Sequence, residues 1–136
     1  MNSGKLPYLE VRYLRQGISP EYKEKGRYLE KGTPIILVDG ENSGEVFFTS
    51  ENGYMGSTFR ELVIFKTFDI RFILFFINHY QKKLRENKTG SAIPHLNKKM
   101  FDELPLPLMP LNRQMETVSI VEKQFELLDQ IKDELN

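Results

Sequence analysis

The sequence predicts an α+β protein: a small twisted mixed β-sheet with one large and one short helix, followed by a long C-terminal coiled-coil-like helix. Three observations predict this class. Short apolar runs bounded by glycine-rich and polar segments fill the first 65 residues, which is typical of strands. Apolar residues then recur at helical spacing over residues 69–88. Finally, a proline-rich segment precedes a second stretch of helical spacing that reaches residue 136.

The first strand is expected at residues 6–14. Its apolar and charged residues alternate, so that Leu9, Val11 and Tyr13 share one face. This alternation predicts a half-buried strand. The polar segment 16–32 follows, and because glycines and a proline interrupt it, we expect a loop with at most a short turn.

Three further strands are expected before the first helix. The continuous apolar run at 35–38 predicts one strand, and the segment 45–49 predicts the next. The Asp-Gly and Ser-Gly pairs between them predict either a hairpin or a tight reversal at 39–44. A glycine-rich loop at 50–57 then leads to a last strand at 58–65.

The large helix is expected to begin after Asp69, a good capping residue, and to end at the Thr-Gly pair at 89–90. Its apolar stripe follows the i, i+3, i+4, i+7 pattern: Ile70, Ile73, Leu74, Ile77, Tyr80 and Leu84. A short helix at 97–104 comes next. We expect its Met100, Phe101 and Leu104 to face inward.

A proline-rich connector and a final helix complete the chain. Three prolines within 104–111 exclude a helix or a central strand there, so the segment is extended and semi-rigid. Asn112 is expected to cap a helix on the order of 37 Å long, at about 1.5 Å per residue. Its apolar seam consists of Met115, Val118, Val121, Phe125, Leu128 and Leu135, and Ile120, Leu127 and Ile131 flank it. Packing on another helix is favoured over folding back on the body.

Composition excludes several classes of protein. With 136 residues, 40% hydrophobic and 28% charged, the chain is long enough for one domain with a core and is not disordered. It has no cysteine, which excludes disulfides and thiolate metal sites. The longest apolar run, 72–77, is far below the roughly 20 residues that span a bilayer. No signal-peptide pattern opens the sequence, so a cytoplasmic protein without membrane partners is expected.

The neutral net charge hides an asymmetry along the chain. Residues 1–100 contain 16 lysines and arginines against 11 aspartates and glutamates, a net charge of +5. Residues 101–136 contain 3 against 8, a net charge of −5. A basic body and an acidic tail indicate two parts with different partners, of which only the body suits a polyanion.

Nothing in the sequence predicts catalysis. His79 and His95 have no partners at ligand or triad spacing, so a structural role is favoured for each. The Asp-Gly-Glu segment at 39–41 lacks the alternating ligands of a calcium loop and is typical of a turn. No phosphate-binding glycine motif stands in a strand-to-helix context. We therefore expect no catalytic residue, no metal and no cofactor.

Basic residues group in three places. The first group lies in the 16–32 loop, with tyrosines between its cations; the others close the large helix and open the short one. Cations at a helix C-terminus also complement its dipole, so a solvated face is the alternative for the second group. The Gly-Ser pair at 90–91 and the Asn97 cap offer backbone N–H groups to an anion such as phosphate, which favours nucleic acid.

At this point the sequence resembles a known family. The segments 90–97 (GSAIPHLN) and 104–111 (LPLPLMPL), then Gln114 and the Ile-Val pair at 120–121, are similar to the distal part of a target recognition domain in the DNA-specificity subunit of type I restriction–modification systems. There, a Gly-Ser/Thr turn, a short helix and a Pro-Leu-Pro connector lead into a long helix with a glutamine and an Ile-Val pair. Similar segments also occur at 6–12, 36–40 and 53–59, so the resemblance covers nearly the whole chain.

The resemblance implies a DNA target recognition domain at 1–104, a connector at 105–111, and at 112–136 a helix for dimerisation and methyltransferase docking. Such subunits are not enzymes. Each recognition domain reads one half of a bipartite site in double-stranded DNA. The long helices pair antiparallel, act as a spacer and dock the methyltransferase (modification) subunits, which the restriction subunits join later.

Two departures from the family bear on assembly. Family subunits carry two recognition domains and two long helices, whereas this chain has one of each and lacks the segment that precedes residues 6–8 in the family. A half-length subunit, a gene fragment and an excised domain all fit these departures. A half-length subunit is expected to form a homodimer through its C-terminal helix, whose two-fold symmetry implies a palindromic split site.

The expected DNA contacts divide into two sets. Phosphate contacts are expected from Lys82, Lys83, Arg85, Lys88, Ser91 and Lys98, and base contacts from Tyr22, Lys23, Lys25, Arg27, Asn52 and Tyr54. The helix seam, from Met115 to Leu135 as given above, is expected to bind protein. The alternative function is a helix-mediated interaction module, or a non-functional fragment, that does not bind DNA.

Overall fold

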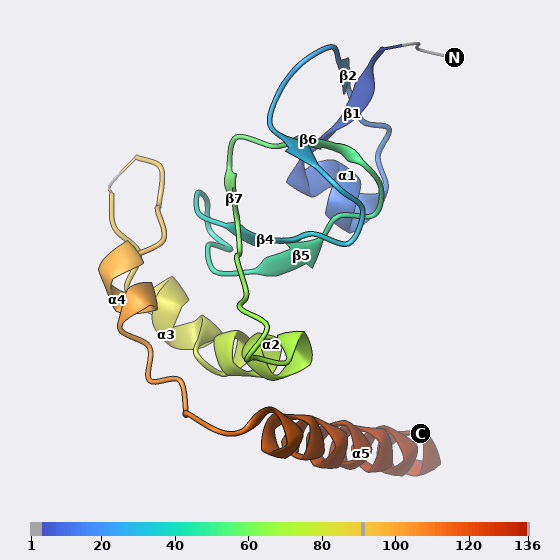
Figure 1. The fold of residues 1–136 in the computed structure, drawn as a ribbon, viewed down its shortest axis with the longest axis vertical. Helices are drawn as coiled ribbons and strands as arrows, with labels where there is room; N and C mark the ends of the chain where they lie inside the picture. The colour runs from blue at the N-terminus through green and yellow to red at the C-terminus, as the bar shows by residue number, and fades with distance from the viewer. Residues whose placement is uncertain (1–3, 91, 136) are drawn as a thin grey trace. The chain divides into compact units, whose positions relative to one another are not determined.

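The computed structural model describes residues 4–90 and 92–135, and it divides into two compact units. The first unit contains Met1–Val63 and Tyr80–Leu104, and the second contains Ile64–His79 and Pro105–Asn136. All strands of the described residues lie in the first unit, and the long C-terminal helix lies in the second (Figure 1). The predicted α+β class is therefore confirmed.

One sheet of the first unit has four short strands in the order β2-β1-β6-β3. These are β1 (Leu6–Leu9), β2 (Tyr22–Lys23), β3 (Tyr28–Leu29) and β6 (Gly53–Met55). Strand β1 is antiparallel to β2 and parallel to β6, while β3 is antiparallel to β6. The sheet is thus mixed, as the sequence predicts.

The other sheet has three antiparallel strands in the order β5-β4-β7. These are β4 (Pro34–Leu37), β5 (Val46–Phe48) and β7 (Phe59–Glu61). The turn between β4 and β5 closes a hairpin, the first of the two alternatives left open by the sequence. Gly44 has a φ of 100° in this turn, a conformation that favours glycine because it has no Cβ.

Two apolar clusters form the core of the first unit, and the central strand β4 contributes to both. One face of β4 joins the first cluster and the other face joins the second, as expected for a strand buried on both sides. The first contains Leu9, Leu29, Ile35, Leu37 and Phe59. The second contains Ile36, Val38, Leu84 and Leu96.

The predicted strand at 6–14 is wrong in its second half. Strand β1 ends at Leu9, and helix α1 (Val11–Gln16) follows. Gly17 ends this helix in the left-handed conformation and donates its N–H to the carbonyl of Tyr13. Val11, Tyr13 and Leu14 pack against the first cluster. The alternation that predicted a strand also fits one helical turn, and only packing distinguishes the two.

The two predicted loops were only partly correct. The 16–32 segment contains β2 and β3, and the 50–57 segment contains β6. Conversely, the strand expected at 58–65 is shorter and ends at Glu61. Strands of two or three residues are too short to show a period-2 pattern. They form because they pair with segments distant in the chain, so local patterns in the sequence do not predict them.

The large helix is interrupted at Tyr80. Helix α2 (Ile70–His79) belongs to the second unit, whereas α3 (Gln81–Glu86) belongs to the first. The side chain of Asp69 accepts hydrogen bonds from the backbone N–H groups of Arg71 and Phe72, which confirms it as a cap. The continuous helix predicted over 69–88 is wrong because its two halves pack in different units.

The short helix is confirmed as α4 (Lys98–Asp102). Asn97 caps it by accepting a hydrogen bond from the N–H of Met100 at 3.1 Å. Three predicted inward-facing residues, Met100, Phe101 and Leu104, pack against the second apolar cluster.

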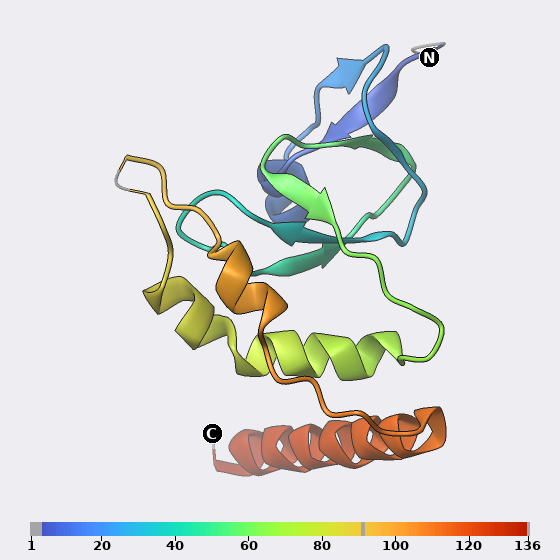
Figure 2. The same cartoon turned by 60° about the vertical axis from the view of Figure 1, so that its left-hand side comes forward.

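The final helix, α5 (Leu111–Leu135), begins one residue before the predicted cap. Asn112 therefore lies inside the first turn, and the carbonyl of Pro110 accepts the N–H of Gln114 instead. Helix α5 packs on α2 (Figure 2). The rings of Phe75 and Phe125 are stacked, with 6.4 Å between their centroids. It thus folds back on a helix that the sequence analysis assigned to the body of the same chain. The alternative that the sequence favoured, packing on a helix outside the body, is wrong for this part of α5.

Candidate nucleic-acid interface

Three tyrosines form a row across the four-stranded sheet. Tyr54 on β6 is directly opposite Tyr8 on one side and Tyr28 on the other. Directly opposite residues share a face of the sheet, so the three rings lie on one face. The other face carries Leu9 and Leu29, which are buried in the core. The tyrosines therefore lie on the outward side.

A lysine completes this outward side. Lys23 on β2 is opposite Leu6, which puts it on the same face as Tyr8, and its Nζ atom lies 3.7 Å from the centroid of the Tyr8 ring. We call Tyr8, Lys23, Tyr28 and Tyr54 the tyrosine face. It combines positive charge with flat rings and hydroxyl groups, the kind of surface that binds nucleic acid.

The loop that connects β2 and β3 is held against Tyr54. The Tyr54 hydroxyl donates to the carbonyl of Glu24 at 3.2 Å, and Met55 donates its N–H to the carbonyl of Arg27. At Gly26, a Cβ atom would lie 2.9 Å from the Tyr54 side chain, so only glycine fits this approach. The loop thus presents Lys25 beside the tyrosine face.

Some predicted base contacts already serve the scaffold. The side chain of Asn52 accepts the N–H of Lys31 at 2.7 Å, and Arg27 pairs with Glu61 at 2.8 Å. Tyr22 is 48% exposed, but it is opposite Pro7 and so belongs to the other side of the sheet.

A shallow cavity of about 200 Å³ adjoins Tyr8. Glu10, Arg12, Ser57 and Thr58 also line it, and the Tyr8 hydroxyl accepts the N–H of Ser57. This volume is below the roughly 300 Å³ at which small-molecule sites begin. The cavity is therefore a depression beside the tyrosine face rather than a ligand pocket.

The second basic group is carried by α3, which is anchored by its apolar side. Leu84 is fully buried in the second cluster, and Gln81 donates to the carbonyl of Gly44 in the β4–β5 turn. The neighbouring cations Lys82, Lys83 and Arg85 are therefore held on the exposed side of the helix. Lys88 differs, because its side chain is only 17% exposed and pairs with Glu41 at 3.2 Å.

The loop after α3 is tied to the same turn. His95 pairs through Nδ1 with Asp39 at 2.6 Å, Gly40 donates to the carbonyl of Pro94, and Thr89 and His95 exchange two backbone hydrogen bonds. These contacts confirm the structural roles expected for His95 and for the turn at 39–41. Ser91, a predicted phosphate contact, lies outside the described residues. Lys98, on α4, is exposed.

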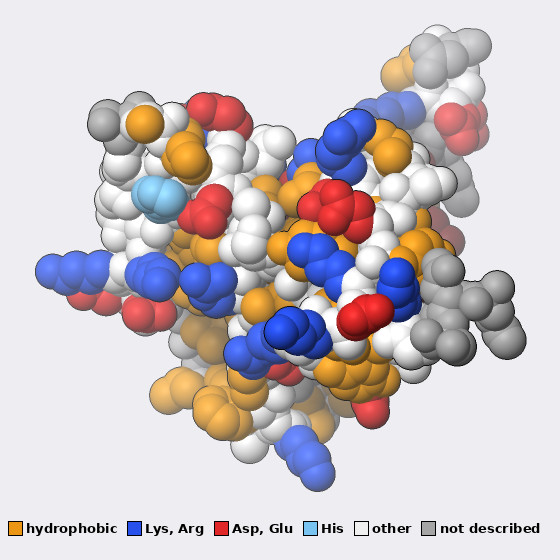
Figure 3. Space-filling view, turned by 90° about the horizontal axis from the view of Figure 1, so that it is seen from above, with side chains coloured by type: hydrophobic (Ala, Val, Ile, Leu, Met, Phe, Trp, Pro, Cys, Tyr) orange, Lys and Arg blue, Asp and Glu red, His pale blue; other side chains and the backbone are white. Residues whose placement is uncertain are grey.

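The two predicted sets of DNA contacts lie on different parts of the first unit. In Figure 1, α3 and α4 lie at the opposite end of the first unit from β1 and β2. Figure 3 shows Lys and Arg side chains in several separate groups, with Asp and Glu side chains between them. A protein that binds an extended duplex can use two such groups, because phosphates continue along its whole length.

Tyr8 and Tyr28 are not among the contacts predicted from the sequence. The strand pairing that aligns them with Tyr54 joins residues far apart in the chain. Period-2 alternation around Tyr8 is the local signal that it faces outward, and the local signal for Tyr28 is its place among the cations of the 16–32 segment.

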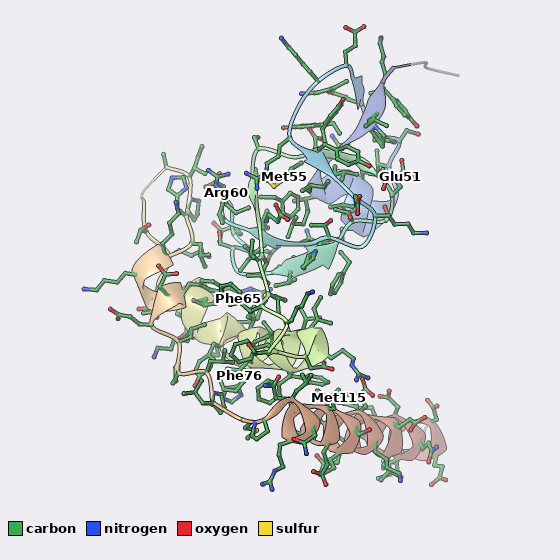
Figure 4. The ribbon with its side chains drawn as sticks, in the orientation of Figure 1. Glu51, Met55, Arg60, Phe65, Phe76 and Met115 are labelled. Carbon is green, nitrogen blue, oxygen red and sulfur yellow. The ribbon has the colours of Figure 1, made fainter. Side chains whose placement is uncertain are left out.

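The predicted protein-binding seam on α5 divides into two parts. Val118 is fully buried, Val121 is half-buried and Phe125 stacks on Phe75, so α2 already contacts this part of the helix. Met115 lies on the side of α5 that faces Phe76 of α2 (Figure 4). The second part of the seam, Leu128 and Leu135, is exposed, and so are the predicted flanking residues Ile120, Leu127 and Ile131.

Within the part of the chain that the structure describes, no helix is long and apolar enough to cross a membrane. Within residues 4–90 and 92–135, no three histidine or acidic side chains come together as a metal site.

Comparison with known proteins identifies the following similarities. The family model described as the type I restriction modification DNA specificity domain matches residues 1–136. The type I restriction enzyme MjaVIII specificity subunit of Methanocaldococcus jannaschii is 29% identical over 143 residues, which cover 95% of this chain and 33% of that protein. The chain thus spans about a third of the length of this curated relative.

Solved structures share the fold at low sequence identity. The HsdS subunit from Thermoanaerobacter tengcongensis has a TM-score of 0.66 at 13% identity, covering 98% of this chain and 33% of that one. The type I restriction–modification S subunit from M. genitalium has a TM-score of 0.61 at 18% identity, covering 98% and 35%. A chain from a type I R-M system, studied for its complex assembly, has a TM-score of 0.67 at 14% identity, with the same coverage of 98% and 35%.

Proposed function

Because this chain belongs to the family of type I restriction–modification DNA specificity domains, we propose that it is a non-catalytic DNA-binding module of such a system. It reads one half of a bipartite site in double-stranded DNA and positions the methyltransferase subunits, which the restriction subunits join. It needs no metal or cofactor of its own. Its reading of DNA depends on side chains at base edges, and its affinity depends on contacts to phosphate.

The observation that carries this proposal is the tyrosine face. Tyr8, Tyr28 and Tyr54 are aligned on the outward side of the sheet, and Lys23 and the loop with Lys25 lie beside them. Lys23 and Lys25, for which the sequence predicts base contacts, contact phosphate instead in this proposal. The Tyr8 hydroxyl accepts one hydrogen bond within the chain and can still donate, while the Tyr54 hydroxyl donates one and can still accept, so both can bind base edges. We propose that this face lies on the DNA half-site.

The cations on α3 extend the contact to neighbouring phosphates. Lys82, Lys83 and Arg85 are exposed on a helix whose position is set by buried Leu84. Lys88 contributes to the shape of the β4–β5 turn rather than to DNA affinity, because Glu41 already neutralises it.

Helix α5 supplies the protein-binding surface. Its exposed apolar residues, from Ile120 to Leu135, form a stripe that begins beside the part that α2 covers and continues past it. Such a stripe is stabilised by a partner helix. Residues 101–136 carry a net charge of −5, which disfavours contact with DNA and favours a protein partner. We propose that this stripe docks the methyltransferase subunit and pairs with a second copy.

The test is a band-shift titration of duplex DNA with the full chain, with and without the methyltransferase subunit, over a range of salt concentrations. Replacing Lys23 and Lys25 by Ala should lower the affinity and reduce the salt slope by about one for each lysine. Lys132→Ala is the matched control, since it removes an exposed lysine from the acidic helix, and it should change neither quantity.

Two outcomes would contradict the proposal. If no salt-dependent shift occurs in the presence of the methyltransferase subunit, the chain is a helix-mediated interaction module instead. If the Lys23 and Lys25 variants bind as tightly as the unmodified chain, the tyrosine face is not the DNA surface.

A further inference from the structure

Gln114 is a fully buried polar residue at the start of the α5 seam. Its Oε1 atom accepts the backbone N–H of Asp69 at 2.8 Å, and its Nε2 atom donates to the carbonyls of Thr67 at 3.1 Å and Met109 at 2.9 Å. One side chain therefore joins the turn before α2, the end of the proline-rich connector and the first turn of α5.

The seam position of Gln114 would otherwise suit an apolar residue. Counting along the helix, 114, 118, 121 and 125 follow the alternating spacing of four and three residues that places side chains on one face. The next two members are valines and the last is a phenylalanine. A polar group at such a position is retained in other helical proteins because it specifies one arrangement of the helices.

Apolar packing alone does not specify the angle at which α5 crosses α2. Packing of helix ridges into grooves leaves a scatter of about 15–20° in the crossing angle. Beyond Val118, the α5 contact to α2 consists of half-exposed groups, among them the Phe75–Phe125 stack and the Arg71–Glu122 ion pair at 3.7 Å. Such contacts tolerate sliding, whereas three directed hydrogen bonds do not.

Asp69 connects the hydrogen bonds of Gln114 to the start of α2. Its N–H donates to Gln114, while its carboxylate accepts the N–H groups of Arg71 and Phe72. The first turns of the two helices are therefore linked through one residue, so that a displacement of either turn breaks hydrogen bonds in both.

From this geometry we propose that Gln114 is a positioning residue that sets the direction in which α5 leaves α2. Residue 130 lies about 24 Å along the helix from Gln114, so a tilt of about 15° moves it by about 6 Å. The hydrogen bonds of Gln114 at the first turn of α5 thus set the position of the exposed stripe on its distal half. That consequence for partner docking rests on the proposed function, whereas the positioning itself does not.

The test measures the direction of α5 in the chain alone. The sequence has no cysteine, so Asn78→Cys on α2 and Gln130→Cys on α5, both at exposed positions, provide specific sites for spin labels. Pulsed electron–electron double resonance between the two spin labels should give one narrow distance distribution for the chain with Gln114 unchanged. Gln114→Met keeps the size of the side chain and removes its hydrogen bonds, and it should shift or broaden the distribution by several ångströms.

Two controls separate positioning from general loss of stability. Asn112→Leu removes an exposed amide from the same turn, and Val118→Ala opens a cavity in the seam while leaving the hydrogen bonds of Gln114 in place. Neither should shift the distance, although Val118→Ala lowers the Tm. Gln114→Glu, which keeps the acceptor for Asp69 and loses the donor, should give an intermediate distribution if the Met variant does not fold.

An unchanged distance in a folded Gln114→Met or Gln114→Glu variant would overturn the proposal, and so would an equal shift in Val118→Ala. Binding of the methyltransferase subunit by the same variants is measured separately. A shifted distance with unchanged partner binding would leave Gln114 a positioning residue and would contradict the role proposed for the distal stripe.

Discussion

Side chains near the proposed DNA surface differ in whether their polar groups are already used by the fold. The Lys88 ammonium donates to Glu41 in the β4–β5 turn, and the Asn52 side chain accepts the backbone N–H of Lys31. Each of these hydrogen bonds joins segments that are distant in the chain. Lys83 on α3 is exposed, and so is Lys25 in the loop beside the tyrosine face. Residue type does not distinguish side chains that stabilise the fold from side chains available to DNA, because lysine occurs in both groups.

Replacement of two lysines on the same segment should therefore affect different properties, DNA affinity for Lys83 and stability for Lys88. Lys83→Ala should lower DNA affinity and the salt slope, by about one contact, without changing the Tm. Lys88→Ala should lower the Tm, because it removes the partner of Glu41, while its salt slope stays near that of the unmodified chain. Band shifts at several salt concentrations and thermal unfolding followed by circular dichroism measure the two. Equal effects of both variants would contradict this division.

The capping carboxylate of Asp69 gives the second unit a dependence on pH. Burial by itself would raise the pKa of Asp69, but hydrogen bonds from the Arg71 side chain and from the N–H groups of Arg71 and Phe72 outweigh it and lower the pKa below its usual 3.8. A lowered pKa means that the stabilisation is present above pH 3.8 and is lost as pH falls through the folded-state value.

Asp69→Asn should remove this part of the acid sensitivity. Asparagine also caps helices but does not ionise, so the variant should be less stable at pH 7 and should lose less stability between pH 5 and pH 2. Urea unfolding at several pH values measures the difference. The same pH dependence in both proteins would show that Asp69 does not contribute.

At the scale of elements, α5 combines two surfaces on one helix. In its first half, α2 covers one face, where Gln114 and Val118 are fully buried. Phe125, although 56% exposed, also stacks on Phe75. From residue 122 to residue 135 every side chain is exposed, including Leu128 and Ile131. A single heptad pattern runs through both halves, so the change of partner along the helix has no counterpart in the sequence.

Aspartate substitutions in the two halves should therefore differ. Ile131→Asp should abolish docking of the methyltransferase subunit or of a second copy with a change in stability below about 0.5 kcal/mol. Phe125→Asp should also lower the stability of the α2–α5 pair, since an aromatic pair contributes about 0.5–1.5 kcal/mol beyond its buried area. Elution volume, partner pull-down and chemical unfolding measure these effects. Docking that survives Ile131→Asp would exclude the distal stripe as the protein-binding surface.

For the whole molecule, the boundary between units does not follow the order of the chain. The segment 64–79 lies with the C-terminal residues, although strands precede it and α3 and α4 follow it. The boundaries that the family resemblance implies, 1–104, 105–111 and 112–136, stay predictions as functional domains. In the structure, the C-terminal helix covers part of α2.

Truncation at two points should test this arrangement. A fragment of residues 1–104 loses the cover that α5 gives to Phe75 and the rest of that side of α2, so it should bind a hydrophobic dye and aggregate. A fragment of residues 1–125 keeps that cover and should stay monodisperse, with an unchanged tyrosine face. Size-exclusion chromatography and dye fluorescence measure both. A well-behaved 1–104 fragment would show that α2 does not need α5.

Local patterns in the sequence were sufficient to predict an element where interactions between near neighbours in the chain form it. The Asp69 and Asn97 caps and the long C-terminal helix depend on neighbours within a few residues, and each was predicted from them. The chain reversal at 39–44 was predicted too, and the structure shows which of its two alternatives, the hairpin, is present. The break at Tyr80 was not, because both halves of that segment have helical spacing and differ only in what they pack against.

The sequence by itself determined the α+β class, the separation of a basic body from an acidic helix, and the family to which the chain belongs. Only the tertiary structure decided that Tyr8, Tyr54 and Tyr28 lie in one row, and that Gln114 joins the starts of α2 and α5. The physical reason is distance along the chain. These contacts join residues up to 46 positions apart, and pairing at such separations depends on the folded backbone rather than on any periodicity of the residues.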